Sequence, residues 1–221
     1  MLLNHFGFDA SMKNIYAPLL CGAALVMGPE RLYDTYEIAA HIQSCGVTHI
    51  NMVPTLFYGL LDTIRFSQYQ ELSGVQWVIL GGDRLDPVPI RPWALLDRCR
   101  AQFGNVYGPT ECTSVSIAWK GTKQDILTLD TIPIGRPIDN KYAYICNTDG
   151  ALLPEGMKGM LYLAGTGTIN GYLDSTRDRQ LFRSDPYHTG LMYNTGDLVY
   201  RDAEGQMQFI GRLDFQIKLN G

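Results

Sequence analysis

The segment "VTHINMVPTLFYGLLDTI" (residues 47–64) indicates the fold class of this chain. Residues 47–53 predict a strand. Pro54 then begins a helical pattern, whose apolar side chains are Leu56, Leu60, Leu61 and Ile64. A second apolar run, "VQWVILG" (75–81), predicts the next strand. A strand, a helix and a further strand in this order imply two parallel strands joined by a right-handed crossover.

The same alternation extends to both sides of this segment. Asp34 with Glu37 predicts a helix start, and Gly46 ends that helix. Downstream we expect a helix over 89–103 and a short strand over 105–107. The sequence thus predicts an α/β unit with a parallel sheet, whose ligands bind where the carboxyl ends of the strands converge.

Beyond about residue 130 the pattern changes to short strands between Gly and Pro turns. The expected strands are "KYAYIC", "GMLYLAG", "GDLVYRD", "GQMQFIGR" and "FQIKL". They predict a smaller antiparallel, β-rich unit resembling a distorted barrel. We place the boundary between 125 and 135, which gives an α/β segment over 1–130 and a β-rich segment over 131–221.

Composition restricts the class of partner. Lys and Arg number 18 against 22 Asp and Glu, and the formal net charge is −4, so no basic surface for nucleic acid or an anionic membrane is expected. The five cysteines form no C-x-x-C pair, which indicates reduced, mostly buried thiols, and the four histidines show no metal-ligand spacing. No apolar stretch is long enough to span a membrane. We expect a soluble cytoplasmic protein.

Six segments resemble motifs of the adenylation domains of nonribosomal peptide synthetases, within the superfamily of adenylate-forming enzymes. In chain order they are "FGFDAS" (6–11), "ILGGDRL" (79–85), "NVYGPTE" (105–111), "GMLYLAGTGTINGYL" (159–173), "YNTGDL" (193–198) and "GRLDFQIKLNG" (211–221). One short motif would be weak evidence, but six in the family's order are specific.

The resemblance implies a site for ATP and Mg²⁺. It implies that Thr110 contacts phosphate, that Glu111 binds the metal and that Arg212 contacts the nucleotide, so these three are the candidate catalytic residues. Oxygen ligands suit a hard cation that bridges phosphates. Asp197 resembles the carboxylate that accepts hydrogen bonds from the ribose hydroxyls. The implied ATP-binding residues are Gly82, Asn105, Tyr107, Asp197, Phe209, Arg212 and Lys218.

For Tyr107 and Phe209, which the family would place near adenine, a core position is the alternative, and for Lys218 a solvated position. Asp214 matches the position of the family's hinge.

The resemblance also implies an amino-acid pocket. By position its residues are Asp9, Ala10, Lys13, Asn51, Ile79, Gly81, Val106, Ser114 and Val115. Asp9 would pair with the substrate α-ammonium. Lys13 lies one helical turn further on, so both side chains could enter one cavity. A buried ammonium needs a partner, which favours a substrate side chain ending in a carboxylate or amide, glutamate first and glutamine second. Glutamate-activating domains often have an acidic residue where Asn51 and Val115 stand here.

The implied activity is formation of an aminoacyl adenylate from ATP and an amino acid, followed by transfer to the phosphopantetheine thiol of a carrier protein. The family's Lys-Gly phosphate loop and its C-terminal domain have no match here, so we expect a middle piece of the domain, inactive alone and completed by its remaining segments. Two alternatives stay open. The first is an acyl- or aryl-CoA ligase, whose substrate has no α-ammonium for Asp9 to bind. The second is a degenerate interaction module, which would not need Glu111, Asp197 and Arg212.

Overall fold

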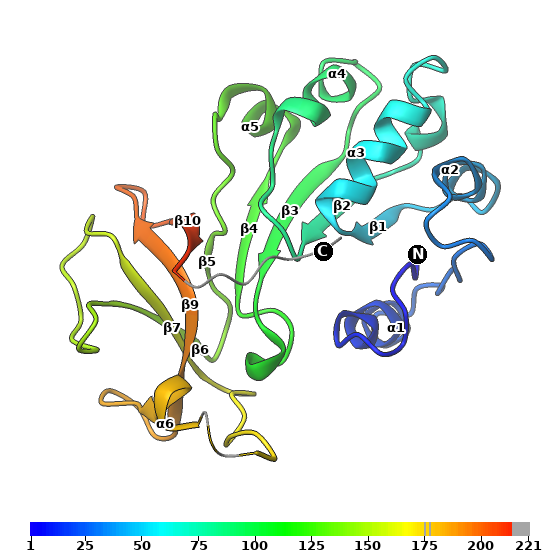
Figure 1. Ribbon diagram of the computed structural model, residues 1–221. Helices are drawn as coiled ribbons and strands as arrows, with labels where there is room; N and C mark the ends of the chain where they lie inside the picture. Colours follow the sequence, from blue (N-terminus) through cyan, green and yellow to red (C-terminus); the bar gives the residue numbers. More distant parts are fainter. Residues whose placement is uncertain (175, 177, 214–221) are drawn as a thin grey trace. The chain divides into compact units, whose positions relative to one another are not determined.

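The computed structural model describes residues 1–174, 176 and 178–213, and these fall into two compact units (Figure 1). Among the described residues, unit 1 contains 1–105 and 120–132, and unit 2 contains 106–119 and 133–213. Residues 106–119 precede the boundary that the sequence predicts, yet they cluster with unit 2. The division into domains at about residue 130 stays a prediction.

The first sheet carries the predicted parallel strands. Its strand order is β1-β2-β3-β4-β5. The strand bounds are His49–Met52 for β1, Trp77–Gly81 for β2, Gln102–Tyr107 for β3, Ile117–Gly121 for β4 and Arg136–Pro137 for β5. Strands β1 and β2 pair in parallel, whereas β4 and β5 pair antiparallel. The predicted α/β class is therefore confirmed, with a mixed rather than wholly parallel sheet.

Helices α2 and α3 of unit 1 begin at residues that favour a helix start. Helix α2 (Thr35–Ser44) follows Asp34, whose side chain accepts hydrogen bonds from the backbone N–H groups of Tyr36 and Glu37. Helix α3 (Pro54–Thr63) has its proline in the first turn, where no N–H is needed. The other helices of this unit are α1 (Ala10–Leu20), α4 (Arg91–Ala94) and α5 (Lys123–Thr128), with short 3-10 turns η1 (Gln70–Leu72) and η2 (Val88–Ile90).

The core of unit 1 forms because the apolar faces of these elements are buried together. Ile38 of α2 and Leu60 of α3 are fully buried, and the two helices lie side by side (Figure 1). Trp93 contacts Phe57 and Phe103 edge-on, with ring centroids 6.0 and 5.8 Å apart. Edge-to-face aromatic pairs of this kind add to the free energy of burial.

The helix predicted over 89–103 is wrong in most of its length. Only the 3-10 turn η2 and the single turn of α4 form before Leu95. Pro89 and Pro92 lie in the first turns of η2 and α4, and the residues after Ala94 form turns instead of continuing the helix. At the other end, Gln102 N–H donates to the Gln76 carbonyl, so this residue already belongs to β3. The strand predicted over 105–107 therefore begins three residues earlier than expected.

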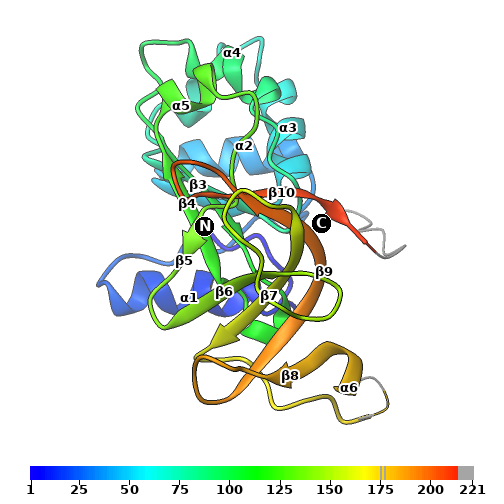
Figure 2. The ribbon, with the colours of Figure 1, turned by 90° about the vertical axis from the view of Figure 1, so that its left-hand side faces the viewer.

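Unit 2 contains the predicted antiparallel sheet, with strand order β10-β9-β7-β6 (Figure 2). Its strands are β6 (Lys141–Cys146), β7 (Gly159–Gly165), β9 (Leu191–Arg201) and β10 (Met207–Arg212). A short strand β8 (Phe182–Ser184) pairs with β9 and follows the one-turn helix α6 (Asp178–Leu181). Four of the five strands predicted after residue 130 are thus observed. The fifth, over 215–219, lies outside the described residues.

Alternation along β7 gives this sheet two buried faces. Leu161 and Leu163 belong to one apolar cluster with Val199 and Met207, whereas Tyr162 and Ala164 belong to another on the opposite face. The register shifts between Met160 and Tyr162 on β7, and again on β10. Bulges of this kind bend a strand and increase its twist, as expected for a sheet that resembles a distorted barrel.

All five cysteines are free thiols, and Cys99, Cys112 and Cys146 are buried, in agreement with the predicted mostly buried thiols. Across residues 1–174, 176 and 178–213, no helix is long and apolar enough to cross a membrane.

Candidate functional site

The loop that follows β3 carries the motif "YGPTE" and is held in a tight conformation. A Cβ added to Gly108 would lie 1.8 Å from the Ser114 carbonyl oxygen, so only glycine fits this close approach. The Ser116 N–H donates to the Tyr107 carbonyl at 2.9 Å and closes the loop. Between them, Thr110–Cys112 forms the 3-10 turn η3.

Two consecutive residues of this loop have left-handed backbone conformations. Thr113 has φ 58° and Ser114 has φ 63°. Residues other than glycine adopt this region rarely, at a cost of about 1–3 kcal/mol each, and such conformations concentrate at functional sites. The strain is a reason to expect function in this loop that is independent of its sequence motif.

Asp197 lies at the centre of the first polar cluster of unit 2. Its side chain is buried, and its carboxylate accepts hydrogen bonds from the hydroxyl of Tyr107 and, at 3.0 Å, from Nη1 of Arg212. The antiparallel register of β9 and β10 sets Arg212 directly opposite Asp197. The structure thus brings together three residues that the sequence predicts as nucleotide-binding.

The electrostatics of this cluster keep Tyr107 a hydrogen-bond donor. Burial raises the pKa of the Tyr107 phenol well above its ordinary value, and the neighbouring Asp197 carboxylate raises it further. Arg212 compensates the buried negative charge of Asp197, which would otherwise be costly in the interior. The cluster thus contains a buried carboxylate whose two oxygens are held by Tyr107 and Arg212.

Glu111 belongs to a second polar cluster of the same unit. The Tyr172 hydroxyl donates to Oε1 of Glu111, and the Ile169 N–H donates to the Glu111 carbonyl at 3.0 Å. The Thr113 hydroxyl donates to the Gly167 carbonyl at 2.7 Å. The segment after β7 is therefore hydrogen-bonded to the "YGPTE" loop at three points.

Two further side chains complete the surroundings of this loop. Thr110 is exposed, with its hydroxyl in reach of solvent. Lys141 at the start of β6 donates from Nζ to the Cys112 carbonyl at 2.5 Å, and burial lowers the pKa of its ammonium. The sequence did not single out Lys141, because a lysine at a strand start gives no signal of its own.

Phe209 packs as a core residue. It is half-buried against the apolar cluster that contains Cys112, Ile117 and Val199, and Tyr107 packs against the same cluster. This placement favours a core position for Phe209 over a position next to adenine. Tyr107 differs because its hydroxyl is also engaged at Asp197.

The donor atoms around Glu111 fit a metal held mostly by a substrate. Within the described part of the chain, no group of three His, Cys, Asp or Glu residues could hold a metal ion. Mg²⁺ does not need such a cage, because it usually binds through one or two carboxylates, waters and phosphate oxygens. The half-buried Glu111 carboxylate, with one oxygen anchored by Tyr172, is suited to that kind of site.

Unit 1 contains one group of the predicted amino-acid pocket residues. Asp9 precedes α1 and does not use its side chain to cap the helix, and Lys13 lies one turn along. Burial lowers the pKa of the Lys13 ammonium, and the Asp9 carboxylate acts in the opposite direction. From β1, Asn51 donates to the Asn14 side chain at 2.6 Å, which ties the strand to α1 beside Lys13.

The remaining predicted residues are distributed as follows. Ala10 begins α1, Ile79 and Gly81 lie on β2, and Gly82 follows β2 with φ 92°. Asn105 is buried on β3. Val106, Ser114 and Val115 belong to unit 2. Asp214 and Lys218 lie outside the described residues.

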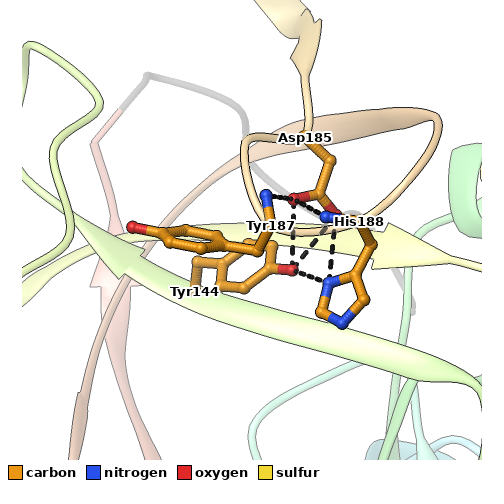
Figure 3. A network of polar contacts seen from close by, with 4 residues as sticks. All are labelled: Tyr144, Asp185, Tyr187 and His188. Atoms are coloured by element: carbon orange, nitrogen blue, oxygen red, sulfur yellow. Dashed lines mark hydrogen bonds and ion pairs between the residues drawn. The ribbon is translucent and has the colours of Figure 1, made fainter.

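A third polar cluster, on the β6 side of unit 2, was not predicted from the sequence (Figure 3). The Tyr144 hydroxyl lies 3.0 Å from Oδ2 of Asp185 and 2.8 Å from Nδ1 of His188. Oδ1 of Asp185 accepts the backbone N–H groups of Tyr187 and His188 at 2.9 and 3.2 Å. Burial and the Asp185 carboxylate raise the pKa of Tyr144. The cluster closes the turn between β8 and β9 onto β6.

With this geometry in place, comparison with known proteins identifies the class. Residues 1–173 match the family model described as AMP-binding enzyme. The match covers most of the chain, so the chain belongs to the AMP-binding enzyme family.

Individual relatives point to one branch of that family. Surfactin synthase subunit 2 of Bacillus subtilis (strain 168) is 34% identical over 225 residues, which cover 100% of this chain and 6% of the relative. Tyrocidine synthase 3 of Brevibacillus parabrevis is 34% identical over 220 residues, covering 98% of this chain and 3% of that protein. The solved structure of PA1221, an NRPS protein containing adenylation and PCP domains, superposes with a TM-score of 0.86 at 31% identity. That superposition covers 99% of this chain and 44% of the PA1221 chain.

The chain thus spans only a small part of the curated relatives that it matches, and less than half of the PA1221 chain. The similarity extends over both units of this chain.

Proposed function

We propose that this chain supplies nucleotide-, metal- and amino-acid-binding residues of an adenylation domain, which forms an aminoacyl adenylate from ATP and an amino acid. The observation that carries the proposal is the buried Asp197 carboxylate, held between Tyr107 and Arg212 next to the strained "YGPTE" loop of the same unit. The similarity to peptide synthetases over the whole chain supports the same reaction.

Asp197 is the proposed ribose-binding residue. A vicinal diol needs an acceptor, and an ionised carboxylate is acceptor-only, with about four lone-pair sites. Tyr107 donates to one oxygen of Asp197 and Arg212 to the other, which fixes the orientation of the carboxylate. Arg212 adds a fixed positive charge close to the nucleotide, and its planar fork suits ribose and phosphate oxygens.

Glu111 is the proposed magnesium ligand, and Thr110 the proposed phosphate contact. The bound Mg²⁺ would neutralise charge on the phosphates during attack by the substrate carboxylate. The chain's own contribution is positional. The exposed Thr110 hydroxyl offers a hydrogen bond to a phosphate oxygen, and the anchored Glu111 offers a hard oxygen ligand. Positioning of this kind lowers the barrier without acid or base chemistry by the protein.

Asp9 is the proposed partner of the substrate α-ammonium, and this assignment favours an amino acid over a fatty or aromatic acid. The Asp9 carboxylate is half-buried and does not cap its own helix, so its oxygens are not engaged by the backbone of α1. Lys13 is the proposed partner of a carboxylate or amide at the end of the substrate side chain, with glutamate first and glutamine second. The lowered pKa of Lys13 reflects a partly desolvated ammonium, as such a role requires.

A carrier protein is the proposed acceptor of the activated acyl group. The support is the similarity to PA1221, which is described as containing adenylation and PCP domains. The remaining segments of the same adenylation domain are the other proposed partners, and a cytoplasmic location is proposed with them.

The test is amino-acid-dependent exchange of pyrophosphate into ATP by the full-length protein that carries this chain. A panel of proteinogenic amino acids is compared with fatty and aryl acids, and Asp9→Asn is the specificity variant. We expect exchange with at least one amino acid and its loss in Asp9→Asn, because the amide removes the charge that pairs with the α-ammonium. Exchange with only non-amino acids would establish the CoA-ligase alternative, and the absence of exchange and of ATP binding would establish the interaction module.

A further inference from the structure

Tyr172 is held at both ends in the segment that follows β7. Its backbone N–H donates to Oδ1 of Asp178 at 3.1 Å, and its ring contacts Phe182 edge-on with centroids 5.7 Å apart. The preceding residue, Gly171, has φ 137°, and a Cβ there would lie 2.5 Å from Oδ2 of Asp178. A glycine is therefore required for this docking, and the direction of the Tyr172 side chain is fixed.

The hydroxyl of the Tyr172 side chain lies at one oxygen of Glu111. The Tyr172 hydroxyl donates to Oε1 of Glu111. The hydroxyl of Tyr193, on β9, is hydrogen-bonded to the side chains of both Tyr172 and Glu111. A phenol keeps its proton at neutral pH, so Tyr172 is the donor of this hydrogen bond and the Glu111 carboxylate is the acceptor. The main chain of Glu111 is fixed as well, through the Ile169 N–H.

This hydrogen bond orients the Glu111 carboxylate for binding a metal ion. A glutamate side chain on a loop has several rotamers, and a donor on Oε1 restricts it to one of them while the other oxygen keeps its lone pairs. Hydrogen bonds to metal-binding carboxylates orient them, and loss of such a partner typically weakens metal affinity by about 10- to 100-fold.

We propose that Tyr172 is a positioning residue for Glu111, which orients the carboxylate for the magnesium ion of MgATP. The inference rests on the proposed function, because it takes Glu111 to be a metal ligand. Neither the composition nor any motif assigns a role to Tyr172, and the geometry alone points to it.

The chain offers a matched control for this proposal. Tyr144 also donates to a carboxylate in unit 2, that of Asp185, in a cluster with no contact to Glu111 (Figure 3). Tyr144→Phe therefore removes the same chemical group from a phenol–carboxylate pair of the same unit. If the loss of a phenol–carboxylate hydrogen bond weakened metal binding only by destabilising the fold, Tyr144→Phe and Tyr172→Phe would weaken Mn²⁺ binding to a similar extent.

The experiment uses the full-length protein that carries this chain, as wild type and as Tyr172→Phe, Tyr193→Phe, Tyr144→Phe and Glu111→Gln. Mn²⁺ replaces Mg²⁺ as the probe, and its dissociation constant is measured by electron paramagnetic resonance with a non-hydrolysable ATP analogue. The half-saturating Mg²⁺ concentration of pyrophosphate exchange is measured in parallel, separately from the rate at saturating Mg²⁺.

We expect Tyr172→Phe to weaken Mn²⁺ binding by about tenfold and to raise the half-saturating Mg²⁺ concentration similarly. The rate at saturating Mg²⁺ should stay within about twofold, because the metal ligand itself is intact. Tyr193→Phe should act in the same direction with a smaller effect, and Tyr144→Phe should match the wild type.

Two outcomes overturn the proposal in distinguishable ways. If Glu111→Gln leaves Mn²⁺ binding unchanged, Glu111 is not the metal ligand, and the proposed function of this residue fails together with the inference. If Glu111→Gln weakens binding but Tyr172→Phe binds Mn²⁺ as the wild type does, or more tightly, only the positioning role fails. An equal weakening in Tyr172→Phe and Tyr144→Phe also overturns that role, because it shows a general loss of stability.

Discussion

Tyr107 and Asp197 are 90 residues apart in the sequence, and the hydroxyl of the first donates to the carboxylate of the second. Arg212 binds the other oxygen of the same carboxylate at 3.0 Å. The end of β3 is thereby tied to β9 and β10 through one buried charge. The sequence motifs that contain Tyr107 and Asp197 are thus in direct contact within unit 2.

Replacing the charge at the centre of this cluster should destabilise the chain. Asp197→Asn keeps the shape of the side chain but removes the negative charge that pairs with the guanidinium of Arg212, which is only 19% exposed. We expect the free energy of unfolding to fall by about 2 kcal/mol or more, measured by urea denaturation. Asp149→Asn, at an exposed position, should change it by no more than about 0.5 kcal/mol. Equal stability of the two variants would contradict this account of the cluster.

The hydroxyl and the ring of Tyr107 should have separable roles. Tyr107→Phe removes a donor to Asp197 and should lower the free energy of unfolding by about 1 kcal/mol. If the ring packs against adenine, Tyr107→Phe should leave the KM for ATP in the full-length protein nearly unchanged, whereas Tyr107→Ala should raise it about tenfold or more, since stacking on an aromatic ring contributes about 1–3 kcal/mol per base. A similar KM for ATP in both variants would show that the ring does not contact the base.

Much of the architecture could be predicted because periodicity is a local property. The strands β1 and β2 and the helices α2 and α3 follow from apolar spacing, a capping aspartate and a proline in the first turn. The helix predicted over 89–103 is observed only as η2 and α4, and β3 begins at Gln102, inside the predicted range.

The candidate site could be predicted only in part. Motif order indicated Tyr107, Glu111, Asp197 and Arg212, and the structure pairs all but Glu111 with one another. Tyr172 and Lys141 were missed, because their contacts depend on how loops dock across a sheet. The Tyr172–Glu111 hydrogen bond joins residues 61 positions apart, and no periodic pattern encodes a contact of that kind.

Alkaline pH should destabilise the chain through Tyr58. Its hydroxyl donates to the Asp86 carbonyl at 3.0 Å and accepts the Asp86 N–H at 2.7 Å, and burial is the main reason that its pKa rises to about 12. A phenol whose pKa is raised in the folded state contributes stability that is fully present below the unfolded pKa of about 10. That stability is lost as the pH rises from about 10 towards 12.

The free energy of unfolding should therefore fall between about pH 10 and about pH 12, and it should fall less steeply in Tyr58→Phe than in the wild type. Urea denaturation at several pH values measures both slopes. Tyr36→Phe, at an exposed position, is the control and should follow the wild-type slope. An identical pH dependence in Tyr58→Phe and wild type would exclude Tyr58 as a source of the alkaline sensitivity.

Lys13 should determine which amino acid the full-length protein activates. Its ammonium is partly desolvated on α1, one turn after Asp9, and Asn51 is tied to the neighbouring Asn14. If Asp9 binds the substrate α-ammonium, the carboxylate or amide of the substrate side chain is the natural partner of Lys13. The measurement is pyrophosphate exchange over a panel of amino acids, for the wild type and for Lys13→Met, which keeps much of the aliphatic length without the charge.

We expect glutamate to be the best wild-type substrate, with glutamine second. Lys13→Met should lower kcat/KM for glutamate by about tenfold to a hundredfold, because a buried carboxylate loses its charged partner, and should change kcat/KM for leucine far less. Lys120→Met, on the exposed side of β4, is the control and should leave the preference intact. If leucine or phenylalanine is the best wild-type substrate, or if Lys13→Met preserves the preference for glutamate over leucine, Lys13 does not select the substrate and the pocket must recognise a different side chain.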